Sequence, residues 1–88
     1  MIREVKARPQ IEDKDYEFKL NHIIRFLEDG AQVKVIIIFR GRETARPDLG
    51  ERVLLRFAKD LEKQAKAELP TVMDGRQMFL KFTPKVAG

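Results

Sequence analysis

The sequence predicts an α/β two-layer sandwich, with a four-stranded mixed sheet and two helices packed on one face. Short β-branched or alternating segments flank two longer segments with helical apolar spacing, and an Asp-Gly pair near the end marks a hairpin. This order reads β-α-β-α-β-β, and right-handed crossovers place both helices on the same side of the sheet. With 88 residues there is room for one core, so residues 1–88 are expected to form a single domain.

The first strand and first helix are predicted from alternation followed by helical spacing. Residues 2–8 can form a short strand with Val5 and Ala7 on one face and charged side chains on the other, and Pro9 ends the strand because it cannot donate to a ladder. Asp13 and Asp15 can cap a helix start, and Gly30 can end the helix in a left-handed conformation. The apolar stripe of this helix, which should face the sheet, consists of Tyr16, Leu20, Ile23, Ile24 and Leu27.

The second strand is predicted at residues 33–40, where both faces are apolar at the centre, as expected of an interior strand. It ends in Arg40-Gly41-Arg42, and Gly41 can turn the backbone out of the sheet at little steric cost. Two guanidinium groups would then project from the rigid end of a buried strand, a position suited to phosphate recognition. The same arginines could serve only to keep a strand end soluble, and the run alone does not decide between these roles.

The second helix should begin near Leu49, since Asp48 and Glu51 have the spacing of a capping box. Its expected core stripe is Val53, Leu54, Phe57, Leu61 and Ala65. Bases recur on the opposite side at spacings of three or four, and form a predicted cationic ridge of Arg52, Arg56, Lys59, Lys63 and Lys66. Such a ridge could bind RNA, although many surface helices of basic proteins are patterned in the same way.

A hairpin is predicted at the end of the chain. Asp74-Gly75 is a strong signal for a two-residue turn, with residues 71–73 leading into it and residues 76–83 leading out. Residues 86–88 are expected to form a loose tail.

The outer side of the first helix is a further candidate for RNA contact. Lys14, Phe18, Asn21 and Arg25 lie away from the apolar stripe, and an aromatic ring among polar groups can stack on unpaired bases. A Phe in such a place is more often covered by a loop or a neighbouring domain. Tyr16 is expected to pack in the core, with its hydroxyl able to reach the helix edge.

The composition favours an acidic partner and excludes several kinds of site. The formal charge is +4, and the excess of bases lies in residues 30–47 and 69–88. The chain has no cysteine and a single histidine, His22, so thiolate chemistry is excluded and zinc lacks a ligand set. The glycines show neither a phosphate-loop nor a dinucleotide spacing, so no cofactor, metal or catalytic site is expected.

The hydropathy pattern bears on location. No apolar stretch approaches the ~20 residues that a membrane span needs. The first six residues also lack the apolar region of a signal peptide. We therefore expect a cytoplasmic protein.

Several short motifs together match one known family. They are Phe39-Arg40-Gly41-Arg42-Glu43, Leu49-Gly50, Val53-Leu54-x-Arg56 and Met73-Asp74-Gly75-Arg76-x-Met78, with Arg8-Pro9, Tyr16, Lys19 and Arg25-Phe26-Leu27-Glu28-x-Gly30 agreeing as well. Over nearly all of residues 3–85 the chain resembles the C-terminal domain of bacterial translation initiation factor 3. Complete factors of this family have two domains joined by a lysine-rich helix, so the resemblance implies that the N-terminal domain and linker are absent here.

The resemblance implies a binding protein rather than an enzyme. The implied partners are the platform of the small (30S) ribosomal subunit and chiefly its 16S ribosomal RNA. Binding there would block joining of the large subunit and support initiator-tRNA and start-codon selection on mRNA. A monomer is expected. Carried over position by position, the implied RNA-binding residues are Arg8, Tyr16, Lys19, Arg25, Arg40, Arg42, Arg56 and Arg76.

The chain departs from the family pattern at several positions. Asn21 and Ile38 stand where relatives can carry arginine, so those contacts should be weakened or absent. Thr44 and Arg46 stand where Met and His are common, which alters the detail of that loop although Arg46 adds charge.

Two alternative functions remain at this point. One is another small basic α/β domain that binds structured RNA. The other is a small phosphatase on a similar sandwich, which would use an arginine cradle and an asparagine. Asn21 is predicted in the middle of a helix rather than on a strand beside Arg40, and this argues against the phosphatase.

Overall fold

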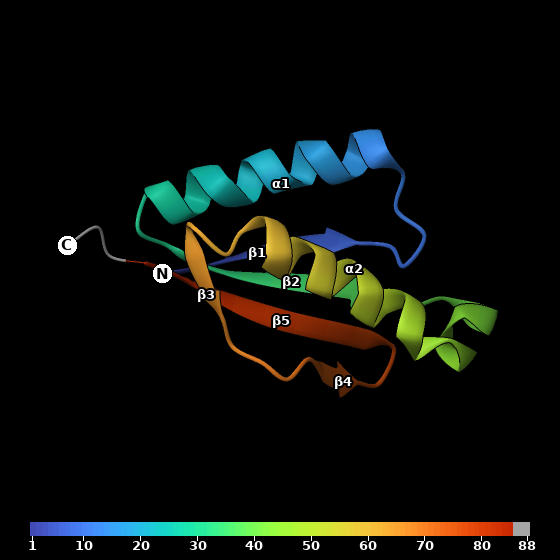
Figure 1. The fold of residues 1–88 in the computed structure, drawn as a ribbon. Helices are drawn as coiled ribbons and strands as arrows, with labels where there is room; N and C mark the ends of the chain where they lie inside the picture. The colour runs from blue at the N-terminus through green and yellow to red at the C-terminus, as the bar shows by residue number, and fades with distance from the viewer. Residues whose placement is uncertain (86–88) are drawn as a thin grey trace.

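The computed structural model describes residues 1–85, and the loose tail predicted at residues 86–88 lies outside the described residues. The elements are β1 (Ile2–Ala7), α1 (Asp13–Glu28), β2 (Gln32–Ile38), the 3₁₀ helix η1 (Gly41–Ala45), α2 (Pro47–Asp60), β3 (Ala65–Ala67), β4 (Val72–Asp74) and β5 (Gln77–Pro84) (Figure 1). All the strands belong to one sheet.

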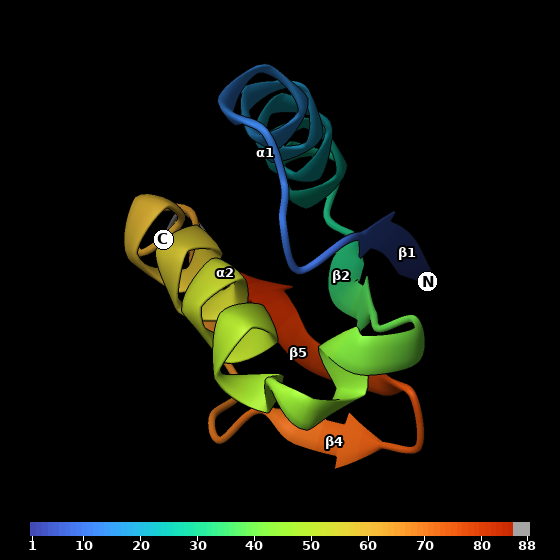
Figure 2. The ribbon, with the colours of Figure 1, turned by 90° about the vertical axis from the view of Figure 1, so that its right-hand side faces the viewer.

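The sheet order is β1-β2-β5-β3, and β4 pairs with the same edge of β5 as β3 does. β1 and β2 are parallel, whereas β5 is antiparallel to each of its neighbours. Both helices cover one face of this sheet, as the two views in Figures 1 and 2 show. The predicted sandwich with a mixed sheet is therefore confirmed, but the sheet has one strand more than predicted.

The additional strand is β3, in a segment that was predicted to continue the second helix. The helix instead ends at Asp60, with Leu61 as its C-cap. Ala65 then pairs with Pro84, and the N–H of Lys85 donates to the carbonyl oxygen of Gln64 over 3.0 Å. This pairing joins segments about twenty residues apart, so no local pattern in residues 61–67 could have indicated it.

One apolar core fills the space between the helices and the sheet. Its most completely buried members, each with at most 1% of its surface exposed, are Ile23, Val33, Val35, Ile37, Phe39, Leu54, Phe57, Leu61, Leu80 and Phe82. Burying one such side chain stabilises the fold by ~1.5–3 kcal/mol. Gly50 lets α2 approach β2 closely, because a Cβ at this position would overlap the ring of Phe39.

The start of α1 differs from the prediction, and its end agrees with it. Glu12 occupies the N-cap and makes no side-chain capping bond, so the predicted capping by Asp13 or Asp15 is wrong. Both aspartates lie in the first turn, where negative charge interacts favourably with the helix dipole. Gly30 follows the C-cap with φ of +86°, which confirms the predicted left-handed stop.

The second helix begins two residues earlier than predicted. Pro47 is its first residue, where the fixed φ of proline suits a helix start. Asp48 does not close a capping box, because its carboxylate accepts hydrogen bonds from the guanidinium of Arg46 over 3.0 and 3.1 Å. Lys63 and Lys66 lie beyond the helix end, so the predicted ridge is limited to Arg52, Arg56 and Lys59 on α2.

Two further boundaries shift because of pairing between strands. β2 ends at Ile38 rather than at residue 40. Asp74 pairs with Gln77 across the hairpin, so the turn residues are Gly75 and Arg76, one position later than predicted. The φ of Gly75 is +62°, which explains why glycine occupies this turn.

Candidate nucleic-acid interface

Half of the predicted RNA-binding residues meet at one end of the sheet, where β1 and β2 finish and β5 begins. This strand-end cluster consists of Arg8 after β1, Arg40 and Arg42 after β2, and Arg76 in the turn before β5. The N–H of Phe39 donates to the carbonyl oxygen of Arg76 over 2.8 Å, which ties the end of β2 to the turn. Figure 2 views this end of the molecule, with η1 lying across it between β2 and α2.

Glu43 holds the loop that carries Arg40 and Arg42. Its Oε1 accepts hydrogen bonds from the guanidinium of Arg8 over 2.7 Å and from the N–H of Arg40 over 2.9 Å. The N–H of Glu43 donates in return to the carbonyl oxygen of Arg40 over 3.0 Å. Glu43 therefore holds the loop through both its side chain and its backbone. Its carboxylate lies between the guanidinium of Arg8 and the backbone of Arg40.

The same contacts keep Glu43 ionised. The backbone N–H of Arg40, followed by the hydrogen bond from Arg8, lowers the pKa of Glu43 below its ordinary value.

Gly41, between the two arginines, has φ of +52°, which confirms the predicted turn out of the sheet. The hydroxyl of Thr44 donates to the carbonyl oxygen of Gly41 over 2.9 Å. Thr44, one of the positions that depart from the family pattern, thus adds a hydrogen bond within the loop.

A second group forms where α1 and α2 meet. The guanidinium carbon of Arg56 lies 3.7 Å from the centre of the Tyr16 ring, and its Nη1 lies 3.4 Å from Oδ1 of Asp13. The hydroxyl of Tyr16 donates to Oδ2 of Asp60 over 2.6 Å. Burial, together with this hydrogen bond, raises the pKa of Tyr16 above its ordinary value, so the phenol stays protonated.

The burial of Tyr16 determines whether its ring can contact RNA directly. Only 2% of its surface is exposed, which confirms the predicted packing in the core and leaves no open ring face. Its ring lies 4.4 Å from that of Phe57, centre to centre. Tyr16 is therefore placed to support Arg56, whose side chain keeps 47% of its surface exposed.

The remaining predicted residues lie along α1, away from the strand-end cluster. Lys19 forms an ion pair of 2.7 Å with Asp15, one helical turn earlier. Arg25 lies on the exposed side in the last turn of α1, about 18 Å along the axis from the helix start. Phe18 is 61% exposed and its ring lies 4.6 Å from that of His22, so no described loop covers it.

Sequence reasoning missed the roles of two acidic residues. Glu43 bonds to Arg8 across 35 positions, and Asp60 bonds to Tyr16 across 44. Separations of this size leave no local signal. Arg46 was expected to add charge to the loop, but its ion pair with Asp48, of 3.0 Å, partly neutralises it.

Within residues 1–85, no group of three or more His, Cys, Asp or Glu side chains is arranged to hold a metal ion. Among the same residues, neither helix combines the length and the apolar character needed to cross a membrane. The fold and the exposed arginines define a small basic α/β domain with an arginine cluster at one end of its sheet.

Comparison with known proteins identifies the family. The family model described as "Translation initiation factor IF-3, C-terminal domain" matches residues 1–85. The chain belongs to this family, which confirms the resemblance stated from its motifs. The family is one of translation initiation factors, in agreement with the expectation of a binding protein rather than an enzyme.

Three relatives illustrate the similarity, and each is named "Translation initiation factor IF-3". The one from Phocaeicola vulgatus is 45% identical over 87 residues, covering 99% of this chain and 44% of the relative. That from Corynebacterium glutamicum (strain R) is 50% identical over 84 residues, covering 96% and 44%. That from Mycobacterium tuberculosis is 46% identical over 84 residues, covering 96% and 42%. The chain thus spans less than half the length of these relatives.

Proposed function

We propose that this domain binds the small (30S) ribosomal subunit in the cytoplasm, as a monomer, through 16S ribosomal RNA. By occupying that surface it prevents association with the large subunit and supports initiator-tRNA and start-codon selection on mRNA. The observation that carries the proposal is the strand-end cluster, in which Glu43 ties the loop of Arg40 and Arg42 to Arg8.

The physical support comes from preorganisation of the cluster. In the described part of the chain, the guanidinium groups of Arg40, Arg42 and Arg76 make no ion pair or side-chain hydrogen bond, and all three residues are exposed. Their donors are thus free for phosphate oxygens. Since the loop is already bonded to Arg8, and Phe39 before it is bonded to Arg76 in the turn, little backbone entropy is lost when RNA binds. The planar fork of arginine matches a phosphate with two parallel hydrogen bonds.

The residues on the helices add a second contact area, away from the strand-end cluster. Arg56 offers a guanidinium held over Tyr16, and Arg25 adds positive charge in the last turn of α1. Lys19 is paired with Asp15 and would exchange this partner for RNA. In this proposal Tyr16 acts through Arg56 and does not itself touch RNA. Asn21 is exposed on α1 and Ile38 ends β2, so neither supplies the cation that relatives can carry there.

The test compares binding of this chain to small subunits, large subunits and unrelated duplex RNA by filter retention. Preferential retention on small subunits, together with inhibition of subunit association followed by light scattering, is the expected result. Equal affinity for both subunits and the duplex RNA would favour the alternative, a general binder of structured RNA. Full binding by a folded Arg40→Ala, Arg42→Ala double variant would remove the strand-end cluster from the site.

A further inference from the structure

The face of the sheet opposite the helices carries a second arrangement of cations, separate from the strand-end cluster. Residues that pair directly across strands point to the same face. The register therefore places Glu4, Lys34 and Lys81 in one row across β1, β2 and β5. The neighbouring row contains Lys6, Ile36, Phe79 and Val72. Both helices lie on the other side, so no described helix covers these rows (Figure 1).

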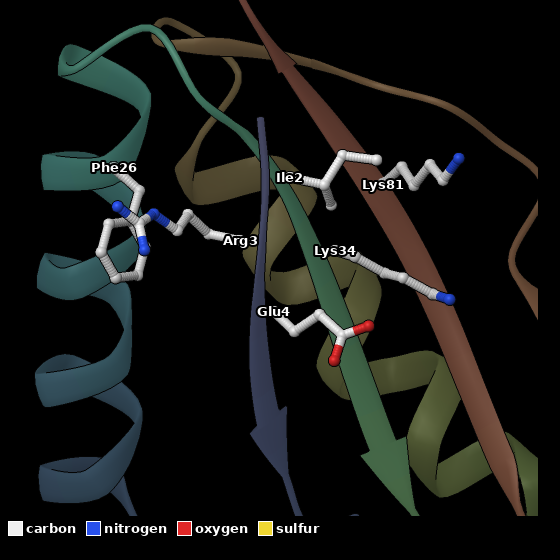
Figure 3. Close-up of a pocket in the computed structure, with 6 residues that line it drawn as sticks. All are labelled: Ile2, Arg3, Glu4, Phe26, Lys34 and Lys81. Atoms are coloured by element: carbon white, nitrogen blue, oxygen red, sulfur yellow. The ribbon is translucent and has the colours of Figure 1, made fainter.

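Lys34 and Lys81 lie directly opposite each other on adjacent central strands. Like charges in this position destabilise a sheet. Among residues 1–85 neither lysine forms an ion pair, although Glu4 is adjacent to Lys34 in the register. Figure 3 shows both side chains reaching out on the same side of the sheet as Glu4, while Arg3 and Phe26 lie on the other side of β1, next to α1. The fold thus keeps two ammonium groups side by side without an ion pair, with Glu4 beside Lys34 and Glu68 beside Lys81.

An aromatic ring lies beside this pair. The ammonium of Lys34 is 4.2 Å from the centre of the Phe79 ring, a cation–π contact. Phe79, Val72 and Pro70 line a hollow of about 190 Å³ together with Lys81 and Glu68. Lys81 also lines a second hollow, next to Lys34, Glu4 and Ile2. The hollow that contains the Phe79 ring therefore borders the one that contains Lys34, and Lys81 belongs to both.

We propose that this open face of the sheet binds single-stranded RNA, with a phosphate between Lys34 and Lys81 and a base against Phe79. A bound phosphate would relieve the repulsion between the two ammonium groups, and the displacement of Lys34 would free the ring face. The two rows are roughly 7 Å apart along the strands, so one nucleotide can occupy both. Aromatic rings among cations on a sheet surface are suited to unpaired bases, since every base has a face that can stack.

This site goes beyond the proposed function, because it uses none of the arginines of the strand-end cluster and recognises a strand rather than a folded RNA. An acidic protein could satisfy the lysines, but the hollow around Phe79 favours a flat ring as its occupant. The two partners differ in a measurable way: only RNA binding depends on the ring of Phe79.

The experiment measures the fluorescence anisotropy of a labelled oligouridylate titrated with the full 88-residue chain. The test variant is Lys34→Gln with Lys81→Gln, and the matched control is Lys63→Gln with Lys85→Gln, which removes the same charge from two exposed positions elsewhere. We expect the test variant to bind about tenfold more weakly or worse, as for lost charged hydrogen bonds. The control should change affinity by no more than about twofold, as for distant surface charge. Equal losses in the two double variants would overturn the proposal, because they would indicate diffuse attraction.

Two further measurements exclude a folding artefact and test the base contact. Removing like charges should leave the melting midpoint of the Lys34→Gln, Lys81→Gln variant unchanged or raised, so weaker binding cannot result from unfolding. Phe79→Leu keeps an apolar side chain but removes the ring, and should weaken binding about fivefold or more. Unchanged binding by a folded Phe79→Leu variant, or by the lysine variant, would overturn the proposal.

Discussion

The guanidinium of Arg8 and the carboxylate of Glu43 are joined by a hydrogen-bonded ion pair of 2.7 Å, across 35 positions of the chain. The pair links the end of β1 to the loop after β2 and fixes the arginines of that loop relative to the sheet. Its strength depends on the charge of Glu43, so it should respond to pH.

The first prediction is that Glu43→Gln lowers the melting midpoint at neutral pH and not at acidic pH. The pKa of Glu43 is lowered in the folded state, so its contribution is fully present above the unfolded-state pKa. The contribution is lost as the pH falls through the folded-state pKa. Melting curves of both proteins across this pH range should therefore converge at the acidic end. A constant difference at every pH would show that the charge of Glu43 does not matter.

The second prediction concerns the shape of the contact at Arg42. Lysine keeps the charge but cannot donate two parallel hydrogen bonds from one planar group. Arg42→Lys should therefore weaken small-subunit binding by ~1 kcal/mol or more. Since Arg42 is exposed, the melting midpoint should hardly change. Arg52→Lys, on the exposed side of α2, is the matched control in a subunit-binding titration. If both variants lose the same affinity, the contact at Arg42 is not specific to arginine.

The third prediction tests the turn that separates the two loop arginines. Gly41 has φ of +52°, and a Cβ there would meet no atom within 4 Å, so the penalty for a side chain is backbone strain alone. For the β-branched Gly41→Val we expect destabilisation of ~1–3 kcal/mol and impaired subunit binding. Gly41→Asn, which tolerates a left-handed backbone, should retain most of both. Measuring the melting midpoint and the subunit affinity of both variants distinguishes backbone strain at position 41 from misplacement of Arg40 and Arg42.

A fourth prediction concerns Arg56. Its ion pair with Asp13 is long and exposed, and such pairs contribute ~0–1 kcal/mol to stability. Arg56→Ala also loses the cation–π contact with Tyr16, worth ~0.5–1 kcal/mol, so it should weaken small-subunit binding strongly while lowering the melting midpoint only modestly. Lys63→Ala, beyond the end of α2, should matter less. Comparable losses for the two substitutions would indicate general charge attraction and not a shaped site.

The fifth prediction is a steep dependence of small-subunit binding on monovalent salt. Each phosphate contact contributes ~0.7–0.9 to the slope of log affinity against log salt, so the strand-end cluster alone implies a slope of about −3 or steeper. The slope should become shallower by about 1 or more in the Arg40→Ala, Arg42→Ala variant. Nearly salt-independent binding would instead point to a contact between apolar protein surfaces.

The sequence by itself determined the features that depend on near neighbours. Helical spacing identified the side chains of α1 that face the sheet, and the glycines at positions 30 and 41 marked turns that both have positive φ. The motifs around Phe39-Arg40-Gly41-Arg42-Glu43 were sufficient to indicate the family. Each of these signals lies within a few residues, because helix periodicity and backbone conformation are local properties.

Only the tertiary structure decided which distant residues come together. β3 exists because Ala65 finds a partner in β5, although its own segment continued a helical pattern. The support of Arg56 by Tyr16, and the opposition of Lys34 and Lys81, depend on helix packing and strand register. Such contacts are selected by the free energy of the whole core and sheet, in which every element constrains the others. No segment read alone contains that information.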